Sequence, residues 1–278
     1  MSLYYYYCKM QTFESMLRTK NFWLTDLTRS NDSEEVLRAY KNLWDRVASR
    51  LKDTDLDKQI LASQLEQLKS VFKIQSVADV PYGCCFCSES DLVQQWREYG
   101  DSGKGVSIGF DLDCINGLSK QYPITSTNIT HSIGYESVIY DSLFVENSMF
   151  KICYNSIQQY GYQAWIMEIL PTFKHYAGFI KNPSFKDEKE TRIVFYPSEY
   201  FTNSIPELGS LETNIVPHYT LSWADGGSSA MRSVKIGYDN PRSIAEIQSL
   251  LLDAGINDDI QISKSECTYQ TRQHNEGR

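Results

Sequence analysis

Hydrophobic and polar residues follow two different periods along this chain, and each change of period marks a predicted element. Leu3–Cys8 is an unbroken run of β-favouring residues and predicts a strand. Thr12–Thr19 has apolar residues at helical spacing and predicts a helix, with Thr12 as its N-cap. Asn21–Leu27 predicts a second strand, and Arg29–Asp32 predicts the turn that follows it.

The longest helical pattern lies in Ser33–Ile74. Its apolar residues recur every three or four positions, and Lys52–Asp57 interrupts the period. We therefore expect two amphipathic helices that pack on a core. A second helical and aromatic segment is predicted over Ser142–Phe179, and a last helix over Ser243–Ala254 that ends at Gly255.

Short runs of β-favouring residues lie between these helices. A short helix is predicted at Asp91–Tyr99 and a Gly-rich turn at Gly100–Gly105, which resembles a phosphate-binding loop only loosely and favours a hairpin-like turn. Further strands are predicted at Gly83–Ser88, Val106–Asp111, Ile133–Tyr140, Thr191–Tyr196, Ile215–Ser222, Ser233–Tyr238 and Ile260–Ser263.

The order of these elements favours an α+β fold, because strands and helices do not alternate as they do in a doubly wound parallel sheet. Neither a linker nor a shift of composition divides the chain. We therefore expect a single domain over residues 1–278, with a helical insertion at about 33–75 and a helical segment at about 142–179.

Composition is that of an ordinary globular protein, with 41% hydrophobic and 22% charged residues. The net charge of −8 argues against a protein that coats nucleic acid through bulk electrostatics. A local basic strip stays open, and its candidates are Arg18, Lys20, Arg29 and Arg38. We expect neither a signal peptide nor a membrane span, and hence a cytoplasmic location, because an apolar run of about 18 residues is absent from the sequence.

The seven cysteines include one local cluster, Cys84-Cys85-Phe86-Cys87. A structural zinc site needs a second pair of ligands at comparable spacing, and the four histidines are isolated from one another in the sequence. We therefore expect no metal here, and predict buried thiols on a core strand.

The segment Ser184–Pro197 is the most informative stretch for chemistry. Glu188, Glu190 and Arg192 are two residues apart, just before the apolar run Ile193–Phe195. In an extended chain, such residues project from one face. Grouped acids and a guanidinium suit a site that holds a phosphate-bearing substrate and stabilises a developing positive charge. A solvated strand end with a local ion pair explains the same pattern equally well.

An ordered set of motifs carries a family resemblance. The motifs are LYYYY, FWLTDLTRSNDSEE, CCFCSESDLVQQWREYGDSGKGVSIGFD, KNPSFKDEKETRIVF and ISKSECTYQTR. They resemble, nearly end to end, the bacterial family called domain of unknown function 2971. The chain departs from that family at Tyr5, where members more often have a basic residue, and at Asn31-Asp32-Ser33, which lacks the proline of the usual Asn-Asp-Pro turn.

The layout also resembles that of ADP-ribosyltransferases, which implies a split, mainly antiparallel sheet that clamps NAD. It implies NAD as substrate and a macromolecular acceptor, nucleic acid or protein. A toxin or anti-phage defence effector would fit this activity, with an antitoxin or chaperone as a further partner and no membrane. The resemblance places catalysis on Glu190 and Glu188. It places NAD binding on Tyr5 or Tyr6 and on Ser88. The chemistry of their side chains adds Tyr99, Arg192 and Asn31 as candidates for nucleotide binding.

Cleavage of the nicotinamide–ribose bond builds positive charge on the ribose, which carboxylates stabilise in glycoside-cleaving enzymes. Glu190 would accept the ribose 2′-hydroxyl and Glu188 would orient the acceptor, while Arg192 would brace the glutamates or bind a phosphate. Asn31 would bind ribose or, as we favour, cap the helix at Ser33.

Aromatic residues before the Gly-rich turn are candidates to stack on the nucleotide. Tyr99 is the better candidate, because Trp96 fits a helix face in the core at least as well.

Two other interpretations stay open. The first is a non-catalytic nucleotide-sensing or protein-interaction module on the same scaffold. The second, ranked last, is a metal-dependent hydrolase that would use Asp101, Asp111, Asp113, Glu188 and Glu190, since carboxylates suit Mg²⁺ or Mn²⁺.

Overall fold

The computed structural model describes residues 2–29, 33–71, 80–115, 117–120, 133–164, 168–197, 216–225, 228–256 and 259–268. Contacts group the chain into two compact units. Unit 1 comprises Met1–Phe22, Phe86–Ile115 and Ser222–Arg278, and unit 2 comprises Trp23–Cys85 and Asn116–Leu221. The fold is mixed, with mostly antiparallel strands and several helices, which agrees with the predicted α+β class.

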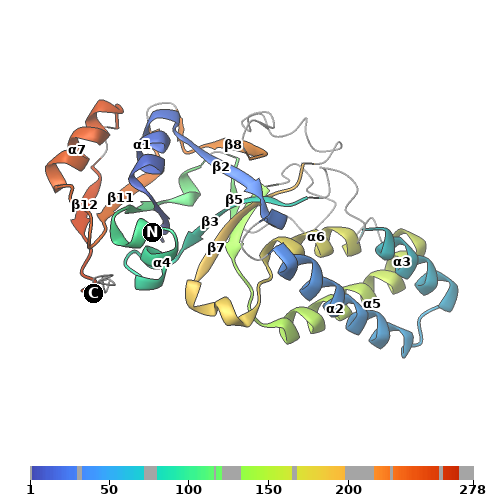
Figure 1. Cartoon of the computed structure of the whole chain (residues 1–278). Helices are drawn as coiled ribbons and strands as arrows, with labels where there is room; N and C mark the ends of the chain where they lie inside the picture. The colour runs from blue at the N-terminus through green and yellow to red at the C-terminus, as the bar shows by residue number, and fades with distance from the viewer. Residues whose placement is uncertain are drawn as a thin grey trace, which may run out of the picture. The chain divides into compact units, whose positions relative to one another are not determined.

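Unit 1 is built on four neighbouring strands in the order β12-β11-β4-β1. They are β1 (Tyr4–Cys8), β4 (Val106–Phe110), β11 (Met231–Ile236) and β12 (Gln261–Lys264). The pairs are antiparallel, except that β11 and β12 run parallel. Its helices are α1 (Met10–Thr19), α4 (Val93–Glu98) and α7 (Ile244–Asp253), and a small hairpin joins β9 (Ala224–Asp225) to β10 (Ser228–Ser229) (Figure 1).

The ends of these helices test the predicted caps. α7 begins with a capping box between Ser243 and Glu246, and Gly255 follows its end with a φ of 70°, as predicted. The N-cap prediction for α1 is wrong, because Thr12 lies inside the helix and Lys9 occupies the cap. The Phe13 amide donates to the Lys9 carbonyl at 3.0 Å, so the helix begins three residues earlier than the side-chain pattern indicates.

Unit 2 contains most of the remaining strands. They are β2 (Asn21–Asp26), β3 (Tyr82–Cys87), β5 (Ser119–Lys120), β6 (Ile133–Ser137), β7 (Glu190–Phe195) and β8 (His218–Ser222). The unit boundary falls inside β2, β3 and β8, and the unit 2 portions of β2 and β8 pair with each other. β7 lies between β3 and β6, and it pairs antiparallel with β6 in a register that sets Arg192 opposite Glu136.

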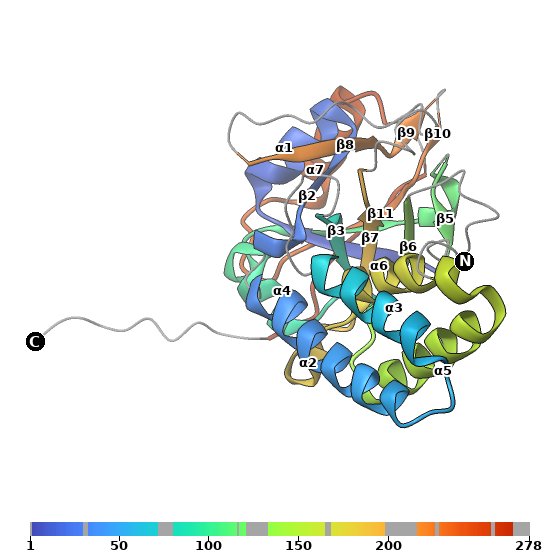
Figure 2. The ribbon, with the colours of Figure 1, turned by 90° about the vertical axis from the view of Figure 1, so that its right-hand side faces the viewer.

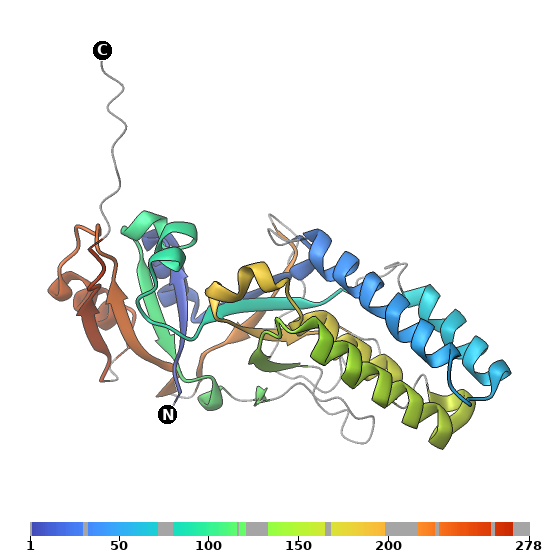
Figure 3. The same ribbon diagram turned by 90° about the horizontal axis from the view of Figure 1, so that it is seen from below.

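Four helices of unit 2 share one hydrophobic core. They are α2 (Ser33–Lys52), α3 (Lys58–Val71), α5 (Ser142–Tyr160) and α6 (Leu170–Phe179). Val47, Val145 and Met149 are among its fully buried members, and Figure 2 shows the helices gathered together. α2 and α5 lie side by side, which Figure 3 shows from below. The predicted pair of helices in residues 33–74, with its break after Lys52, is confirmed over the described residues.

Short 3₁₀ helices complete the connections, at Leu27–Arg29, Asp101–Gly103, Leu112–Cys114, Gly161–Gln163 and Pro183–Glu188. The second of these is the predicted Gly-rich turn. Gly103 has a φ of 88°, and a Cβ there would lie 2.4 Å from the Tyr238 ring, so this position requires glycine.

Candidate functional site

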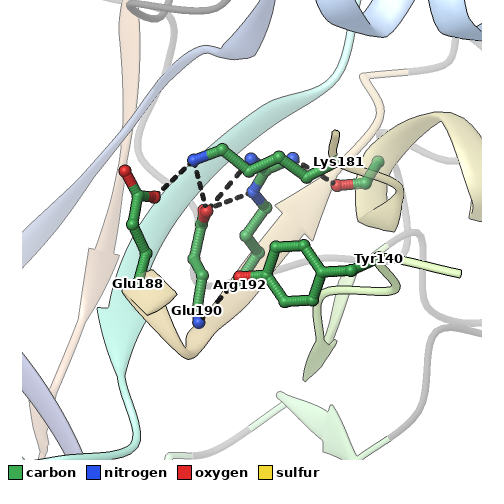
Figure 4. A network of polar contacts seen from close by, with 6 residues as sticks. Tyr140, Lys181, Glu188, Glu190 and Arg192 are labelled. Carbon is green, nitrogen blue, oxygen red and sulfur yellow. Dashed lines mark hydrogen bonds and ion pairs between the residues drawn. The ribbon is translucent and has the colours of Figure 1, made fainter. Parts of the chain in front are cut away.

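A buried network of charged side chains surrounds the start of β7 in unit 2 (Figure 4). Glu188 ends the 3₁₀ helix Pro183–Glu188, Lys189 adopts a left-handed conformation with a φ of 49°, and β7 begins at Glu190. The expectation that Glu188 and Glu190 project from one strand face is therefore wrong. The turn at Lys189 nevertheless brings both carboxylates to one cation, Lys181.

Lys181 lies between the two acids. Its Nζ is 2.5 Å from Glu188 Oε2 and 2.8 Å from Glu190 Oε2, and it also lies 4.8 Å from the ring centre of Phe185. The backbone amide of Lys181 donates to the Ile139 carbonyl at 3.1 Å, which fixes the residue just after α6. Burial alone would lower the pKa of Lys181, but the neighbouring carboxylates outweigh it and raise that pKa, so the ammonium stays charged.

Arg192 braces Glu190 with a two-pronged contact. Its Nε donates to Glu190 Oε1, and its Nη2 donates to Glu190 Oε2 at 3.2 Å. Its Nη1 donates to the Gly178 carbonyl of α6 at 3.2 Å. Arg192 is only 4% exposed, and its three guanidinium nitrogens are all engaged. The structure therefore has Arg192 in the bracing role, which is one of the two roles considered for this residue.

Glu190 is the centre of this network and is 6% exposed. Burial acts to raise the pKa of its carboxyl, but Arg192 and then Lys181 outweigh burial and lower the pKa to about 2. The carboxylate is therefore ionised at every physiological pH. Its backbone amide donates to the Tyr140 hydroxyl at 3.1 Å, which anchors the first residue of β7.

Cys85 lies close to Glu190, whose charge acts on its thiol. Cys85 is an exposed residue of β3, yet desolvation of its thiol by the surrounding protein is the main cause that raises the pKa of that thiol, and the Glu190 charge adds to it. Cys85 is therefore a neutral thiol at pH 7. The prediction of buried thiols holds for Cys84 and Cys87 but is wrong for Cys85, which projects from the strand face opposite to Cys84.

These contacts fill most of the acceptor capacity of Glu190. A carboxylate offers about four lone-pair positions. Arg192 occupies two of them and Lys181 a third. These donors belong to two cations, whereas the group near the fourth position is the neutral thiol of Cys85. A ligand hydroxyl that reaches Glu190 therefore has one position that these cations leave to it.

Four of the other predicted site residues, Tyr5, Tyr6, Ser88 and Tyr99, lie in unit 1. Tyr5 and Tyr6 follow each other in β1 and so face opposite sides of the strand. Tyr5 is half-buried and paired in register with Gly109, whereas Tyr6 packs edge-on against Phe86 with ring centres 5.9 Å apart. Ser88 is exposed directly after β3.

The two aromatic candidates near the Gly-rich turn differ. Tyr99 is 41% exposed just after α4, while Trp96 is fully buried and donates its Nε1 hydrogen to Asp91 at 2.7 Å. Trp96 therefore belongs to the core. Asn31, the remaining candidate, lies outside the described residues.

Sequence reasoning missed Lys181, Tyr140 and Cys85 as members of the network. Lys181 had one usable signal, since it is the charged residue between the apolar end of α6 and Asn182-Pro183. A lysine at such a position needs an acidic partner when it is buried. The sequence offered no such signal for Tyr140 and Cys85, because their contacts join segments that are far apart in the sequence.

Among the described residues, none of the His, Cys, Asp and Glu side chains form a group of three suited to hold a metal ion. Within the same residues, every helix is too short or too polar to cross a membrane.

Comparison with known families gives one match. The model of the family described as Protein of unknown function (DUF2971) matches residues 95–193, so the family resemblance is confirmed over that part of the chain. The matched part runs from α4 through Arg192, and it contains every member of the charged network except Cys85. Neither the curated proteins nor the solved structures contain a match.

Proposed function

We propose that this chain, which carries the DUF2971 match over residues 95–193, is an ADP-ribosyltransferase-like enzyme that uses NAD to modify a macromolecule. The observation that carries the proposal is the Glu190 carboxylate. It is held ionised by Arg192 and Lys181, and these cations leave one acceptor position, near the neutral thiol of Cys85. A split sheet of the ADP-ribosyltransferase type is part of the same proposal.

In this mechanism the ribose 2′-hydroxyl of NAD donates to the acceptor position of Glu190 that Arg192 and Lys181 leave open, next to Cys85. The nicotinamide–ribose bond breaks, its electron pair leaves with nicotinamide, and positive charge develops on the ribose. The fixed negative charge of Glu190 stabilises that cation without reorganising, because Arg192 already holds the carboxylate in place. Glu188 shares Lys181 with Glu190 and activates or orients the acceptor nucleophile. The nucleophile then attacks the ribose carbon and gives its proton to the Glu188 carboxylate.

One observation favours a second candidate, a non-catalytic nucleotide-sensing or protein-interaction module. The network contains two acids and two bases, so its formal charge is balanced, and Glu190 and Arg192 are almost fully buried. Balanced buried ion pairs commonly serve as a structural brace. In that case ligand binding occurs without turnover, and the glutamates matter for stability alone.

The test measures nicotinamide release from NAD, together with transfer of label from adenylate-labelled NAD to polymers of a cell extract. Glu190→Gln removes the negative charge and is expected to reduce turnover by at least about 100-fold. Glu146→Gln is the matched control, because it breaks ion pairs with Arg46 and Arg50 elsewhere in unit 2. Circular dichroism at the assay temperature confirms that each variant is folded.

A second variant separates catalysis from stability. Cys85→Met leaves every charge of the network in place but fills the position that the ribose hydroxyl would take. Turnover is expected to fall at least tenfold with little change in the melting temperature. If the wild-type protein and the Glu146→Gln control release no nicotinamide while still binding NAD, the module interpretation replaces the enzyme.

A further inference from the structure

Trp23 in β2 presents an exposed indole ring in unit 2, with 46% of its surface accessible. The ring stacks on His218, with centres 4.1 Å apart and planes 18° from parallel. His218 is 5% exposed and donates from Nδ1 to the Val216 carbonyl at 2.7 Å. Because His218 covers one side of the indole, the accessible area lies on the opposite side and along the edge.

The support beneath the indole is rigid. Tyr219 follows His218 in β8 and packs edge-on against both Tyr82 and Phe195, with ring centres 5.0 Å apart in each pair. These contacts tie the short β8 to β3 and β7, so His218 has little freedom to move away from Trp23. A large aromatic ring that is exposed and yet fixed in orientation is suited to stack on a planar ligand.

This platform shares a strand face with the charged network. Thr25 of β2 pairs with Gly83 of β3 in antiparallel register. Trp23 and Cys85 are each two residues from that pair, in the same direction along the ladder, so their side chains leave the same face. Both residues are exposed, and Glu190 lies close enough to Cys85 for its charge to act on the thiol.

We propose that the open side of Trp23 stacks on a cationic heteroaromatic ring, the pyridinium ring of NAD. The choice of this ring rests on the proposed function. The indole face is the strongest partner that a protein side chain offers to a cation, and a pyridinium adds ring stacking to that attraction. The ionised carboxylate of Glu190 on the same face complements the same positive charge.

The geometry also accounts for the release of nicotinamide after its bond to the ribose breaks. When the nicotinamide–ribose bond breaks, its electron pair goes to the ring nitrogen, and the ring becomes neutral. Neutral nicotinamide loses the cation–π attraction to Trp23 and leaves.

A nucleic-acid strand fits this surface less well, because backbone binding needs basic side chains beside the stacking ring. In the described residues of β2 and the turn after it, the one arginine is Arg29, which is ion-paired with Asp26 at 3.2 Å.

The test is equilibrium dialysis with labelled 1-methylnicotinamide, a pyridinium cation that cannot be turned over. Trp23→Ala is expected to weaken binding roughly tenfold, and Trp23→Phe by less, since Phe is a poorer cation–π partner. Tyr162→Ala is the matched control, because Tyr162 is a 57% exposed aromatic residue in the same unit. Neutral nicotinamide should bind wild-type protein more weakly than the cation.

The platform is ruled out if Trp23→Ala binds 1-methylnicotinamide like wild-type protein, or if neutral nicotinamide binds as tightly as the cation. It is also ruled out if Trp23 is needed for binding a single-stranded oligonucleotide but not the cation. Because the probe is not turned over, the two proposals fail separately. A Glu190→Gln protein with unchanged NAD turnover and Trp23-dependent cation binding contradicts the catalytic role alone.

Discussion

Each unit contains one carboxylate that accepts several contacts, and the two carboxylates differ in whether their donors are charged or neutral. In unit 2, Glu190 is held by the buried cations Arg192 and Lys181. In unit 1, Asp91 accepts hydrogen bonds from neutral donors instead. They are Trp96 Nε1 at 2.7 Å, Ser265 Oγ at 2.6 Å and the Glu266 amide at 2.7 Å, while Lys235 Nζ stays 3.9 Å away.

The two environments shift the pKa in the same direction for different reasons. At both carboxyls burial acts to raise the pKa and is outweighed. At Asp91 hydrogen bonds led by Ser265 outweigh it, whereas at Glu190 the Arg192 charge does so. Loss of Asp91 therefore leaves neutral donors that water can satisfy. Loss of Glu190 leaves two buried cations with too little negative charge, so Glu190 is expected to be the more sensitive position.

The largest expected effect is the loss of stability in Glu190→Gln. Removing one partner of a buried ion pair costs on the order of 3 kcal/mol of unfolding free energy, because the remaining charge stays buried. Urea denaturation of the variant and of the Glu146→Gln control measures the difference.

The double variant Glu190→Met with Arg192→Met sharpens this result. It removes a complete ion pair and leaves Lys181 with Glu188, so it should lose less stability than Glu190→Gln alone. A double variant that loses the sum of the two single losses would contradict the account of Glu190 as a charge-balanced centre.

The second prediction concerns the stability of the fold at low pH. Glu190 has a pKa of about 2 in the fold against an ordinary 4.5, so its contribution is complete above about pH 4.5 and is lost as pH falls towards 2. That contribution amounts to about 3 kcal/mol.

His175 adds a loss at higher pH, since burial lowers its pKa to about 4 from 6.5 despite Glu136 at 3.4 Å. Its neutral form is favoured by folding, so stability also declines as pH falls from about 6.5 to 4. Urea midpoints measured from pH 7 to 2.5 should show both declines. In Glu190→Gln the decline below pH 4.5 should be smaller, and an unchanged decline would count against the assigned pKa.

The smallest expected effect is that of Asp91→Asn. The amide keeps one acceptor oxygen but turns an NH₂ group either towards the Glu266 amide or towards the donors of Trp96 and Ser265, which costs about 1–2 kcal/mol. Ser265→Ala removes one of these donors and should cost less. Thermal unfolding of both variants checks this order. A loss from Asp91→Asn as large as that from Glu190→Gln would remove the distinction between charged and neutral support.

The elements that sequence patterns predicted well are those with local causes. β1, the two helices α2 and α3, and the Gly255 end of α7 all follow from periodicity and capping chemistry within a few residues. The two-residue spacing of Glu188, Glu190 and Arg192 predicted that all three share one strand face. This prediction is wrong for Glu188, because the left-handed conformation of Lys189 interrupts the extended chain. Trp96 was left between a stacking role and a place in the core, and the structure places it in the core, while the exposure of Cys85 was missed.

The sequence by itself determined the class of fold, most element positions and the gathering of charge near residue 190, because periodicity, turn chemistry and local composition act within a few residues. Only the tertiary structure decided which charges meet. Lys181, Tyr140 and Cys85 reach Glu190 from three other segments of unit 2, and Trp23 meets His218 across nearly 200 residues. Burial then sets the strength of each contact, since the pKa and reactivity of a carboxyl depend on the desolvation and partners that long-range packing supplies.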